Sequence, residues 1–424
     1  MKKHISISVS TIMAAGVLGS LGATAMAHAR PQKRHAPVTL SILWTASPAT
    51  RATLRAAGGA FSKTHPWVHF AYNFVPSGQS TKFRLDLAAG TPPDIVHMDS
   101  VFTDALAAGG QLFDLSKLGA GKLAQDYLPI TWKTVLYRGQ VYSLPFDTNT
   151  ICLQYNVNLF HRAGIQQPPG NWTQLVADAQ KIKQKTGDWG YQIPSSPQSS
   201  GWLQYNFLTW LWREGGHVLN PARNKAVYNS PAGVAALQKL VDLGNRGIVP
   251  KDAYDEGGFF SGKFGMTDDG SWQVPNWKKN IGGEHKFIRF APLPVLKKGV
   301  PAYDDLGLYN LSIPKGAAHP RTAYAFIQFL STNLKYQLQY DEPQGFIPSL
   351  RAGAKTAFYR AYPWPVFEKE LALAKIRPAV PAWPEIATDM GNALQAALTG
   401  MQSPRQALNT AVKRDDGALS SRQP

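Results

Sequence analysis

The sequence predicts an α/β fold with two lobes, and two observations carry that prediction. Segments with the pattern of strands and of helices alternate from residue 38 onward, which is typical of helices layered on a mostly parallel sheet. The chain has 424 residues, 44% of them apolar and 11% aromatic. This composition suits a well-packed globular protein, and the length exceeds one ordinary hydrophobic core, so two lobes are expected.

The alternation is clearest near the start of the predicted folded region. Residues 38–44 (VTLSILW) and 67–75 (WVHFAYNFV) are rich in β-branched and aromatic side chains, which favours strands. Residues 48–63, which lie between them, follow a helical pattern. A short helix over 82–89 and a third strand over 95–98 complete the series.

Capping residues and spacing predict further helices along the chain. Asn171 precedes a helical pattern that Gly187 ends. Ser230 and Ser403 each precede a proline, which is typical of an N-cap followed by Pro at the first helical position. The apolar run over 324–330 predicts another helix.

The N-terminus shows the three parts of a removable export signal. A basic start is followed by a short apolar run over 12–21 and by the small-x-small pattern AMA at 25–27. Residues 1–27 are therefore predicted to be cleaved as a signal peptide, and 28–37 to form a basic linker. No cysteine directly follows the apolar run, so no lipid anchor is expected. The exported protein is therefore predicted to be periplasmic.

The distribution of charge argues against nucleic acid as a partner, and the cysteine count argues against thiol chemistry. The formal net charge is +17, and loss of Lys2 and Lys3 with the signal leaves +15, a balance that could attract nucleic acid. The basic residues are scattered, however, and their densest group lies in the predicted linker, so nucleic acid is not expected as a partner. The single cysteine, Cys152, stands in an apolar run and is predicted to be a buried, unreactive thiol.

No motif in the chain predicts a cofactor. Residues 257–263 fit the pattern G-x-x-x-x-G-K, but Phe264 stands where a phosphate-binding loop needs Ser or Thr to bind magnesium. The histidines lack metal-like spacing, and one cysteine rules out a cysteine-based zinc cluster. We therefore expect neither nucleotide nor metal.

A secreted carbohydrate-cleaving enzyme is the main rival hypothesis from the residues. Such an enzyme needs two carboxylates about 5–10 Å apart, one as acid and one as base or nucleophile. The candidates are Asp99, Asp147, Asp268, Asp269, Asp304 and Asp305. The sequence does not place them relative to one another, and the two Asp-Asp pairs are interpreted as solvated turn residues in preference to catalytic ones.

The aromatic residues suggest a sugar-binding pocket. Such pockets combine flat apolar ring faces with carboxylates and amides that bond hydroxyl groups. Trp202 and Tyr205 begin an aromatic segment after a Ser/Pro/Gly loop. Ligands of open α/β sheets bind at the carboxyl ends of strands, and this location favours Trp44, Asp99 and Trp272.

Short motifs over nearly the whole predicted mature chain resemble those of family 1 extracellular solute-binding proteins. These are the sugar-catching components of ABC importers, such as the maltose- and trehalose-binding proteins. The matching stretches are AAGTPPD at 88–94, LFDL at 112–115, GQVYSLP at 139–145, LQYNVNLF at 153–160, AGI at 163–165, PPGNW at 168–172, GKFGMTDDGSW at 262–272 and GMQSPRQAL at 400–408. Each is modest alone, and their order and spacing together are specific.

The resemblance implies a two-lobe periplasmic-binding-protein fold, type II-like, with a ligand cleft between lobes that several strands join. By position, crossings are expected near residues 146–150, 304–310 and 341–346. The predicted lobes are an N-lobe of residues 38–146 plus 307–341 and a C-lobe of residues 147–306 plus 342–424.

The resemblance also implies the cargo and the partners. A di- or oligosaccharide is expected in the cleft, and ligand contacts to both lobes would favour a closed form that permease subunits of the inner membrane read. The predicted site residues are Trp44, Asp99, Ser100, Asp147, Asn149, Trp202, Tyr205, Trp272 and Phe346. No catalysis is expected, and the carrier is predicted to be a monomer. The open alternatives are the same fold carrying a glycerol phosphodiester, a polyamine or iron, and the hydrolase.

Overall fold

The computed structural model describes residues 35–75, 79–193, 200–250, 259–275 and 287–421. The predicted signal peptide and most of the predicted linker lie outside these residues. From Pro37 onward the chain forms one compact unit. None of the helices that the structure describes is both long enough and apolar enough to cross a lipid bilayer.

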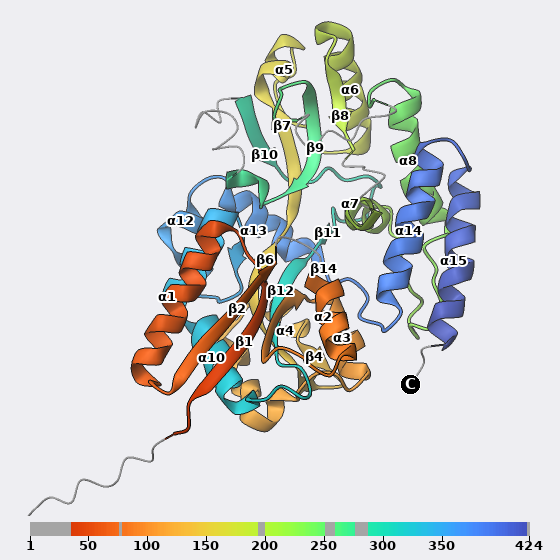
Figure 1. Cartoon of the computed structure of the whole chain (residues 1–424). Helices are drawn as coiled ribbons and strands as arrows, with labels where there is room; N and C mark the ends of the chain where they lie inside the picture. Colours follow the sequence, from red (N-terminus) through yellow and green to blue (C-terminus); the bar gives the residue numbers. More distant parts are fainter. Residues whose placement is uncertain (1–34, 76–78, 194–199, 251–258, 276–286, 422–424) are drawn as a thin grey trace, which may run out of the picture. The chain divides into compact units, whose positions relative to one another are not determined.

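The larger sheet has six strands, ordered β13-β6-β12-β3-β1-β2 (Figure 1). Their bounds are β1 Val38–Thr45, β2 Val68–Val75, β3 Ile95–Asp99, β6 Ser143–Asn149, β12 Gly307–Ser312 and β13 Ile347–Pro348. Strands β1, β2 and β3 are parallel, as helical crossovers between them require. The prediction of a mostly parallel sheet is wrong, because β12 runs antiparallel to both β3 and β6, and β13 runs antiparallel to β6.

Helices cover both faces of this sheet, and the side chains of β1 alternate between them. Leu40 and Trp44 belong to the same buried cluster as Phe61 of α1 (Pro48–Thr64). Leu43, which points the other way, packs in a cluster with Phe83 of α2 (Gln79–Ala88). The remaining helices near this sheet are α3 Val101–Ala108, α4 Pro129–Lys133, α10 Pro320–Thr332 and α11 Leu334–Asp341.

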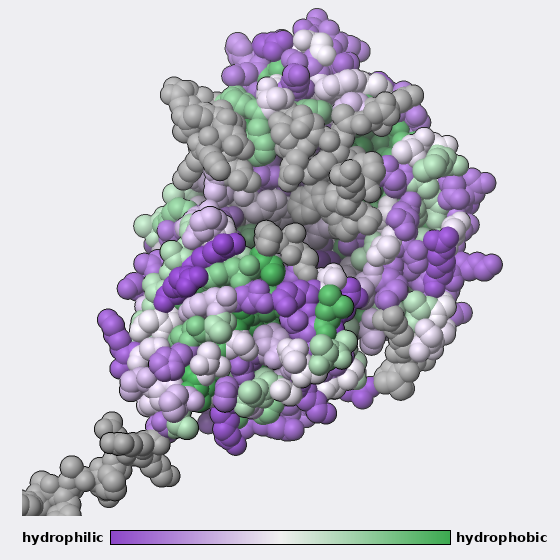
Figure 2. Space-filling view, viewed as in Figure 1, coloured by the Kyte–Doolittle hydropathy of each residue, from purple (hydrophilic) through white to green (hydrophobic). Residues whose placement is uncertain are grey.

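The second sheet has four strands, ordered β10-β7-β9-β8, with β8 Trp189–Gln192, β7 Ile151–Asn156, β9 Phe264–Gly270 and β10 Ile288–Ala291. Its helices are α5 Val157–Arg162, α6 Trp172–Thr186, α7 Ser200–Arg213, α8 Pro231–Asn245, α12 Ala357–Arg360, α13 Trp364–Leu373, α14 Trp383–Leu398 and α15 Pro404–Ser421. Leu153 of β7 shares a large buried cluster with Leu175 of α6 and with Leu394 of α14. On the face seen in Figure 2 the described residues of the outer helices are mostly hydrophilic, as expected when their apolar sides are buried.

Two strand segments carry the chain between the sheets. Strand β6 ends at Asn149 in the larger sheet, and β7 starts at Ile151 in the smaller one, so Thr150 alone separates them. Strand β11 (Asp304–Asp305), which pairs with β14 (Ala374–Lys375), continues through Leu306 into β12. The remaining short elements are β4 Leu136–Tyr137, β5 Gln140–Val141, η1 Leu115–Leu118, η2 Ala120–Asp126, η4 Glu342–Gln344 and η5 Gly353–Lys355.

The interpretation of the Asp-Asp pairs as solvated turns is wrong. Asp268 lies within β9 and is buried, and the Arg213 guanidinium, which pairs with it at 2.5 Å, compensates its charge there. Asp304 and Asp305 form β11 and are both buried. The Asp304 carboxylate accepts the backbone N–H of Ile151 at 2.8 Å, which satisfies a backbone donor at the point where the chain changes sheets.

The capping predictions are confirmed, since their signals are local. The Asn171 side chain accepts the Gln174 N–H at 3.1 Å, and Gly187 ends the helix in the left-handed region. Ser230 caps α8 in the same way. Cys152 is buried, as predicted, and burial raises the pKa of its thiol.

Glu370 gives the fold a testable pH dependence. This carboxyl of α13 is 1% exposed, and its Oε1 accepts the Leu293 N–H at 3.0 Å. Burial raises the pKa of Glu370 to about 8, opposed by Leu293 and Arg213 and assisted by Asp268. Because the folded state holds this proton more tightly than the unfolded chain does, Glu370 should make the free energy of unfolding fall as pH rises from about 4.5 to about 8.

Glu370→Gln should flatten this fall by up to about 1.4 kcal/mol per pH unit in urea unfolding measured from pH 5 to pH 8. Glu368→Gln on the same helix is the matched control, because its side chain is exposed. An unchanged pH slope in the Glu370 variant would show that this carboxyl does not titrate differently on folding.

Candidate functional site

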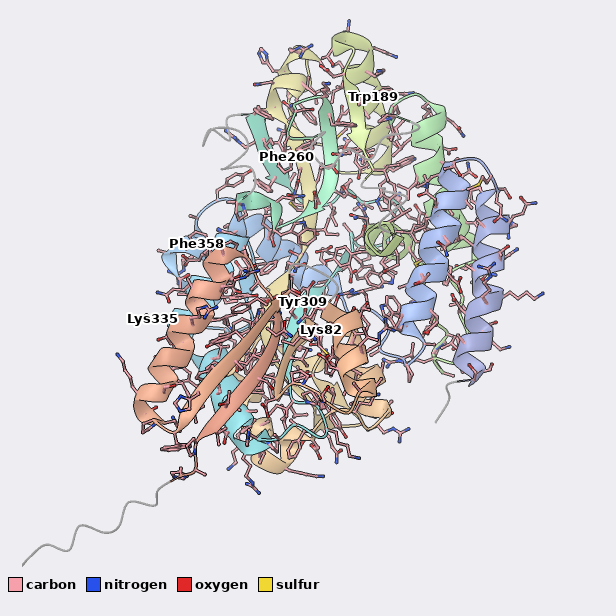
Figure 3. The ribbon with its side chains drawn as sticks, viewed as in Figure 1. Lys82, Trp189, Phe260, Tyr309, Lys335 and Phe358 are labelled. Carbon is pink, nitrogen blue, oxygen red and sulfur yellow. The ribbon has the colours of Figure 1, made fainter. Side chains whose placement is uncertain are left out.

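A pocket of about 330 Å³ lies where strands of the larger sheet meet α7 and the segment that follows β9. Its described lining is Asp99, Asn149, Tyr205, Trp272, Gly307, Leu308, Tyr309, Phe346 and Arg377. Five of the nine predicted site residues are therefore brought together. Tyr309 of β12 is labelled near the middle of Figure 3.

Strand ends position the polar lining. Asp99 is the last residue of β3 and Asn149 the last of β6, so both stand at carboxyl ends of strands, where open α/β sheets bind ligands. Trp272 follows the end of β9 by two residues. The pattern of strand ends that favoured Asp99 and Trp272 in the sequence thus brings them to one pocket.

Two glycines allow close packing of the lining side chains. A Cβ atom on Gly307 would collide with the amide of Asn149, and one on Gly270 would collide with the indole of Trp272. Glycine at these positions lets the amide and the indole lie directly against the backbone. A side chain at either position would displace the amide or the indole from the place it takes in this structure.

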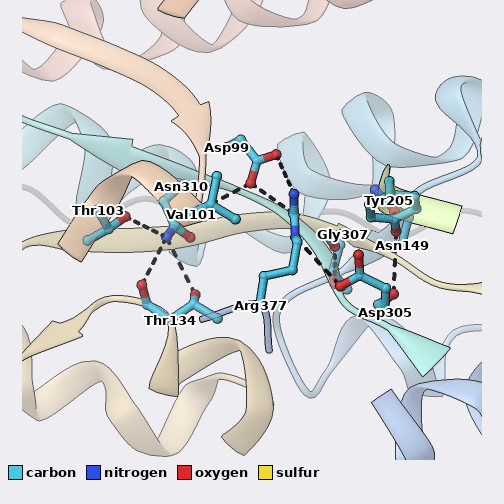
Figure 4. A network of polar contacts seen from close by, with 11 residues as sticks. Asp99, Val101, Thr103, Thr134, Asn149, Tyr205, Asp305, Gly307, Asn310 and Arg377 are labelled. Atoms are coloured by element: carbon cyan, nitrogen blue, oxygen red, sulfur yellow. Dashed lines mark hydrogen bonds and ion pairs between the residues drawn. The ribbon is translucent and has the colours of Figure 1, made fainter. Parts of the chain in front are cut away.

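Arg377 is the central charged residue of the site (Figure 4). Its two terminal nitrogens donate to the two carboxylate oxygens of Asp99, at 3.1 and 2.9 Å, in a bidentate pair. Its Nε lies 3.5 Å from Oδ1 of Asp305. Burial opposes the charge of Arg377, but Asp99 and Asp305 outweigh burial and raise the pKa of Arg377.

Tyr205 of α7 links this ion pair to the rest of the pocket. Its hydroxyl lies 3.2 Å from Oδ1 of Asn149 and 3.3 Å from the carbonyl oxygen of Asp305. The Arg377 guanidinium carbon lies 5.3 Å from the centre of its ring, a cation–π contact. Burial raises the pKa of Tyr205, so its hydroxyl stays protonated and can donate.

The predicted residues Trp44 and Asp147 lie behind the pocket and do not line it. Trp44 is fully buried and stacks on His97 at 4.1 Å, and His97 stacks on Tyr309 at 4.9 Å. Nε2 of His97 lies 2.9 Å from Oδ2 of Asp147, and the Trp44 indole N–H donates to Tyr340 at 2.8 Å. Trp44 thus supports Tyr309, a lining residue, through one intervening ring.

Ser100, a third predicted residue, is not in the described lining of this pocket. Ser100 lines a second cavity of about 680 Å³, which Arg377 also borders. Trp202 is on α7, and its side chain lies outside the described residues.

Tyr309 and Arg377 line the pocket but were not among the predicted site residues. Tyr309 lies inside the crossing that was expected over 304–310, so its position was indicated even though its role was not. Arg377 stands alone between Ile376 and Pro378, and no pattern there distinguishes it from a surface arginine.

The pocket is suited to binding a polar, ring-shaped ligand. Tyr205, Trp272, Tyr309 and Phe346 offer apolar ring surface, and Asn149 and Asp99 offer oxygen atoms that can accept hydrogen bonds. Asp99 is the one carboxylate in the described lining, so the pair needed for glycoside hydrolysis is not found there. Nowhere in the described ranges do three or more His, Cys, Asp or Glu side chains gather as they would around a metal ion.

Comparison with known proteins identifies relatives. Residues 45–333 match the model of the bacterial extracellular solute-binding protein family. The chain is 24% identical to the diacetylchitobiose-binding protein DasA of Streptomyces coelicolor, over 82% of this chain and 80% of that protein. It is 26% identical to the sn-glycerol-3-phosphate-binding periplasmic protein UgpB of Pectobacterium atrosepticum, over 66% of this chain and 67% of that one.

A solved structure confirms the predicted two-lobe fold. The GacH receptor of Streptomyces glaucescens, determined unliganded and with acarbose, matches with a TM-score of 0.79 and 25% sequence identity. The match covers 92% of this chain and all of that one.

The Arg377 ion pairs should contribute strongly to stability. Arg377→Met leaves Asp99 and the buried Asp305 without their cation, and removing one partner of a buried pair costs about 3–5 kcal/mol. Urea unfolding would measure the loss.

Arg414→Met is the control for this measurement, because the Arg414–Asp389 pair is at the surface and should contribute less than about 1 kcal/mol. Equal losses in the two variants would show that the Arg377 pairs add no more stability than a surface pair.

Proposed function

Because the chain belongs to the family of bacterial extracellular solute-binding proteins, we propose that it is the substrate-binding component of an ABC importer and that its cargo is a sugar. The observation that carries the proposal is the pocket lined by Trp272, Tyr309 and Phe346 together with Asp99 and Asn149. Sugars present apolar C–H faces and hydroxyl edges at once, and this lining offers a partner to each.

The relatives support a sugar as the cargo. The GacH receptor was solved with acarbose, and DasA is named for diacetylchitobiose. A pocket of about 330 Å³ lies within the range of small-ligand sites. We propose a di- or oligosaccharide, part of which occupies this pocket.

The mechanism that we propose is binding followed by closure. The proposed lobes are residues 38–146 plus 307–341 and residues 147–306 plus 342–424, and the pocket draws side chains from both, such as Asp99 and Trp272. A ligand that touches both lobes stabilises the closed form, in which those contacts are made together. Permease subunits would bind the closed form. The carrier would act as a periplasmic monomer and would not catalyse a reaction.

An anionic cargo, such as the glycerol phosphodiester among the alternatives, is the second candidate, because UgpB is named for sn-glycerol 3-phosphate, which is also a phosphate ester of glycerol. Titration calorimetry on ligand-free protein distinguishes the two, using maltose, trehalose, longer glucans, xylo-oligosaccharides, glycerol 3-phosphate and spermidine. Saturable one-to-one binding of a sugar that is recovered intact supports the proposal. Consumption of a glycan would instead support a hydrolase.

Trp272→Ala should weaken binding of that sugar at least tenfold, because it removes the ring on which the sugar is proposed to stack. Tenfold corresponds to about 1.4 kcal/mol. Calorimetry measures the affinity, and the unfolding midpoint reports whether the protein remains folded.

Trp189→Ala is the matched control for Trp272→Ala, since Trp189 lies on β8 and does not line the pocket. Unchanged sugar affinity in the Trp272 variant would remove this ring from the site.

A further inference from the structure

We infer that the pocket selects uncharged sugars and rejects phosphorylated or acidic ones, because Arg377 is neutralised within the protein and is not free to bind an anion. The inference rests on the proposed function and narrows its class of cargo. Arg377 acts as a positioning residue that fixes Asp99, and Asp99 is the charged group that meets the ligand.

The geometry of the ion pair occupies the guanidinium. Both terminal nitrogens of Arg377 already donate to Asp99, and Nε faces Asp305. Tyr205 covers the guanidinium from the side, with its ring centre 5.3 Å from the guanidinium carbon. A phosphate could reach the fork donors of Arg377 only by displacing the Asp99 carboxylate from a bidentate pair.

Burial decides which charge the ligand meets. The Arg377 side chain is 7% exposed, whereas that of Asp99 is 25% exposed. The exposed part of the pair is therefore the carboxylate. Hydroxyl groups can donate to it, while a phosphate or carboxylate on the ligand would be repelled at short range.

The net charge of Arg377 and its partners also disfavours an anionic ligand. Asp99 alone cancels the charge of Arg377, and Asp305 lies within 3.5 Å of the same guanidinium. Arg377, Asp99 and Asp305 together therefore carry no net positive charge, whether Asp305 holds a proton or not. Arg377 is also the one cation in the described lining.

Asp99 is fixed in place from a second direction. Its Oδ1 accepts the Val101 N–H at 3.2 Å as well as the Arg377 bond. An anionic ligand could not easily turn the carboxylate aside, because the backbone of α3 and the guanidinium both hold it. The discrimination is thus built into the pocket by the protein's own contacts.

Matched pairs of probes test the inference by titration calorimetry. Maltose is compared with maltose 1-phosphate, and N-acetylglucosamine with N-acetylglucosamine 6-phosphate, with glycerol 3-phosphate as a small anion. The wild-type protein should bind an uncharged member at least a hundredfold more tightly than its phosphate. Equal affinity within a pair would overturn the inference and leave the proposed sugar function standing.

The remaining outcomes distinguish failure of the proposed sugar function from failure of the inferred selection against anionic sugars. Tight binding of glycerol 3-phosphate with no binding of the uncharged sugars would overturn both. If these probes fail and the trehalose, longer glucans and xylo-oligosaccharides of the calorimetry panel fail as well, the proposed sugar function fails, and this inference fails with it.

Asp99→Asn tests the cause of the discrimination. The amide keeps the shape of the side chain, removes the carboxylate that repels a phosphate, and leaves Arg377 with Asp305 as its one remaining anionic partner among the described residues. The phosphate penalty should therefore shrink at least tenfold. Asp389→Asn is the control, since it removes the carboxylate of the surface pair with Arg414 and should leave the penalty unchanged.

An unchanged penalty in Asp99→Asn, in a variant whose unfolding midpoint shows that it is folded, would overturn the role of Asp99. Arg377→Lys adds a second measurement, because lysine keeps the charge but cannot form the bidentate pair. It should lower affinity for the uncharged sugar while the phosphate penalty falls.

Discussion

The ion pairs of Arg377 with Asp99 and Asp305 join three segments that are far apart in the sequence. Asp99 ends β3 of the larger sheet, Asp305 lies in β11 where the chain crosses between sheets, and Arg377 follows β14. A buried guanidinium requires anionic partners with good geometry, since an unpaired charge in this position would be strongly destabilising. Meeting that requirement places the end of β3 against the crossing.

The rest of the pocket depends on this arrangement. Tyr205 packs on the guanidinium and lies within hydrogen-bond distance of Asn149, so α7 and the end of β6 are positioned by the same group. On the other side, His97 stacks between Trp44 and Tyr309 and holds the Tyr309 ring from behind. The pocket wall is therefore supported by buried rings and buried charges, and the ligand meets a surface that is already organised.

Much of the fold follows from local signals in the sequence. The parallel strands β1, β2 and β3 and the capped helices α6 and α8 were predicted, because β-branched runs and capping residues act within a few positions. The order of strands in the larger sheet was not predicted. Strands β12 and β13 join this sheet after crossings, and local sequence patterns do not indicate which strands they pair with. Leu40, Ile42 and Trp44 are alternate residues of β1, so their side chains point to the same face of the sheet. Strand periodicity therefore already indicated that Trp44 faces the core.

Part of the site was predictable from position relative to strand ends. Asp99, Asn149 and Trp272 stand at or just after strand ends, which is a visible location. Arg377 has no such signal, and the burial of Asp305 depends on a partner 72 positions later, as their numbering shows. Long-range charge pairing of this kind cannot be inferred from one sequence, because any exposed arginine has the same local pattern.

The central claim is that this pocket holds an uncharged sugar while Arg377 stays bound to Asp99. A crystal structure of the protein with its tightest-binding uncharged sugar tests it most directly. The account predicts a sugar ring against Trp272, a hydroxyl within hydrogen-bond distance of Asp99, and the bidentate Arg377–Asp99 pair still in place. Density for the sugar outside this pocket, or a ligand group bonded to Arg377 in place of Asp99, would contradict it.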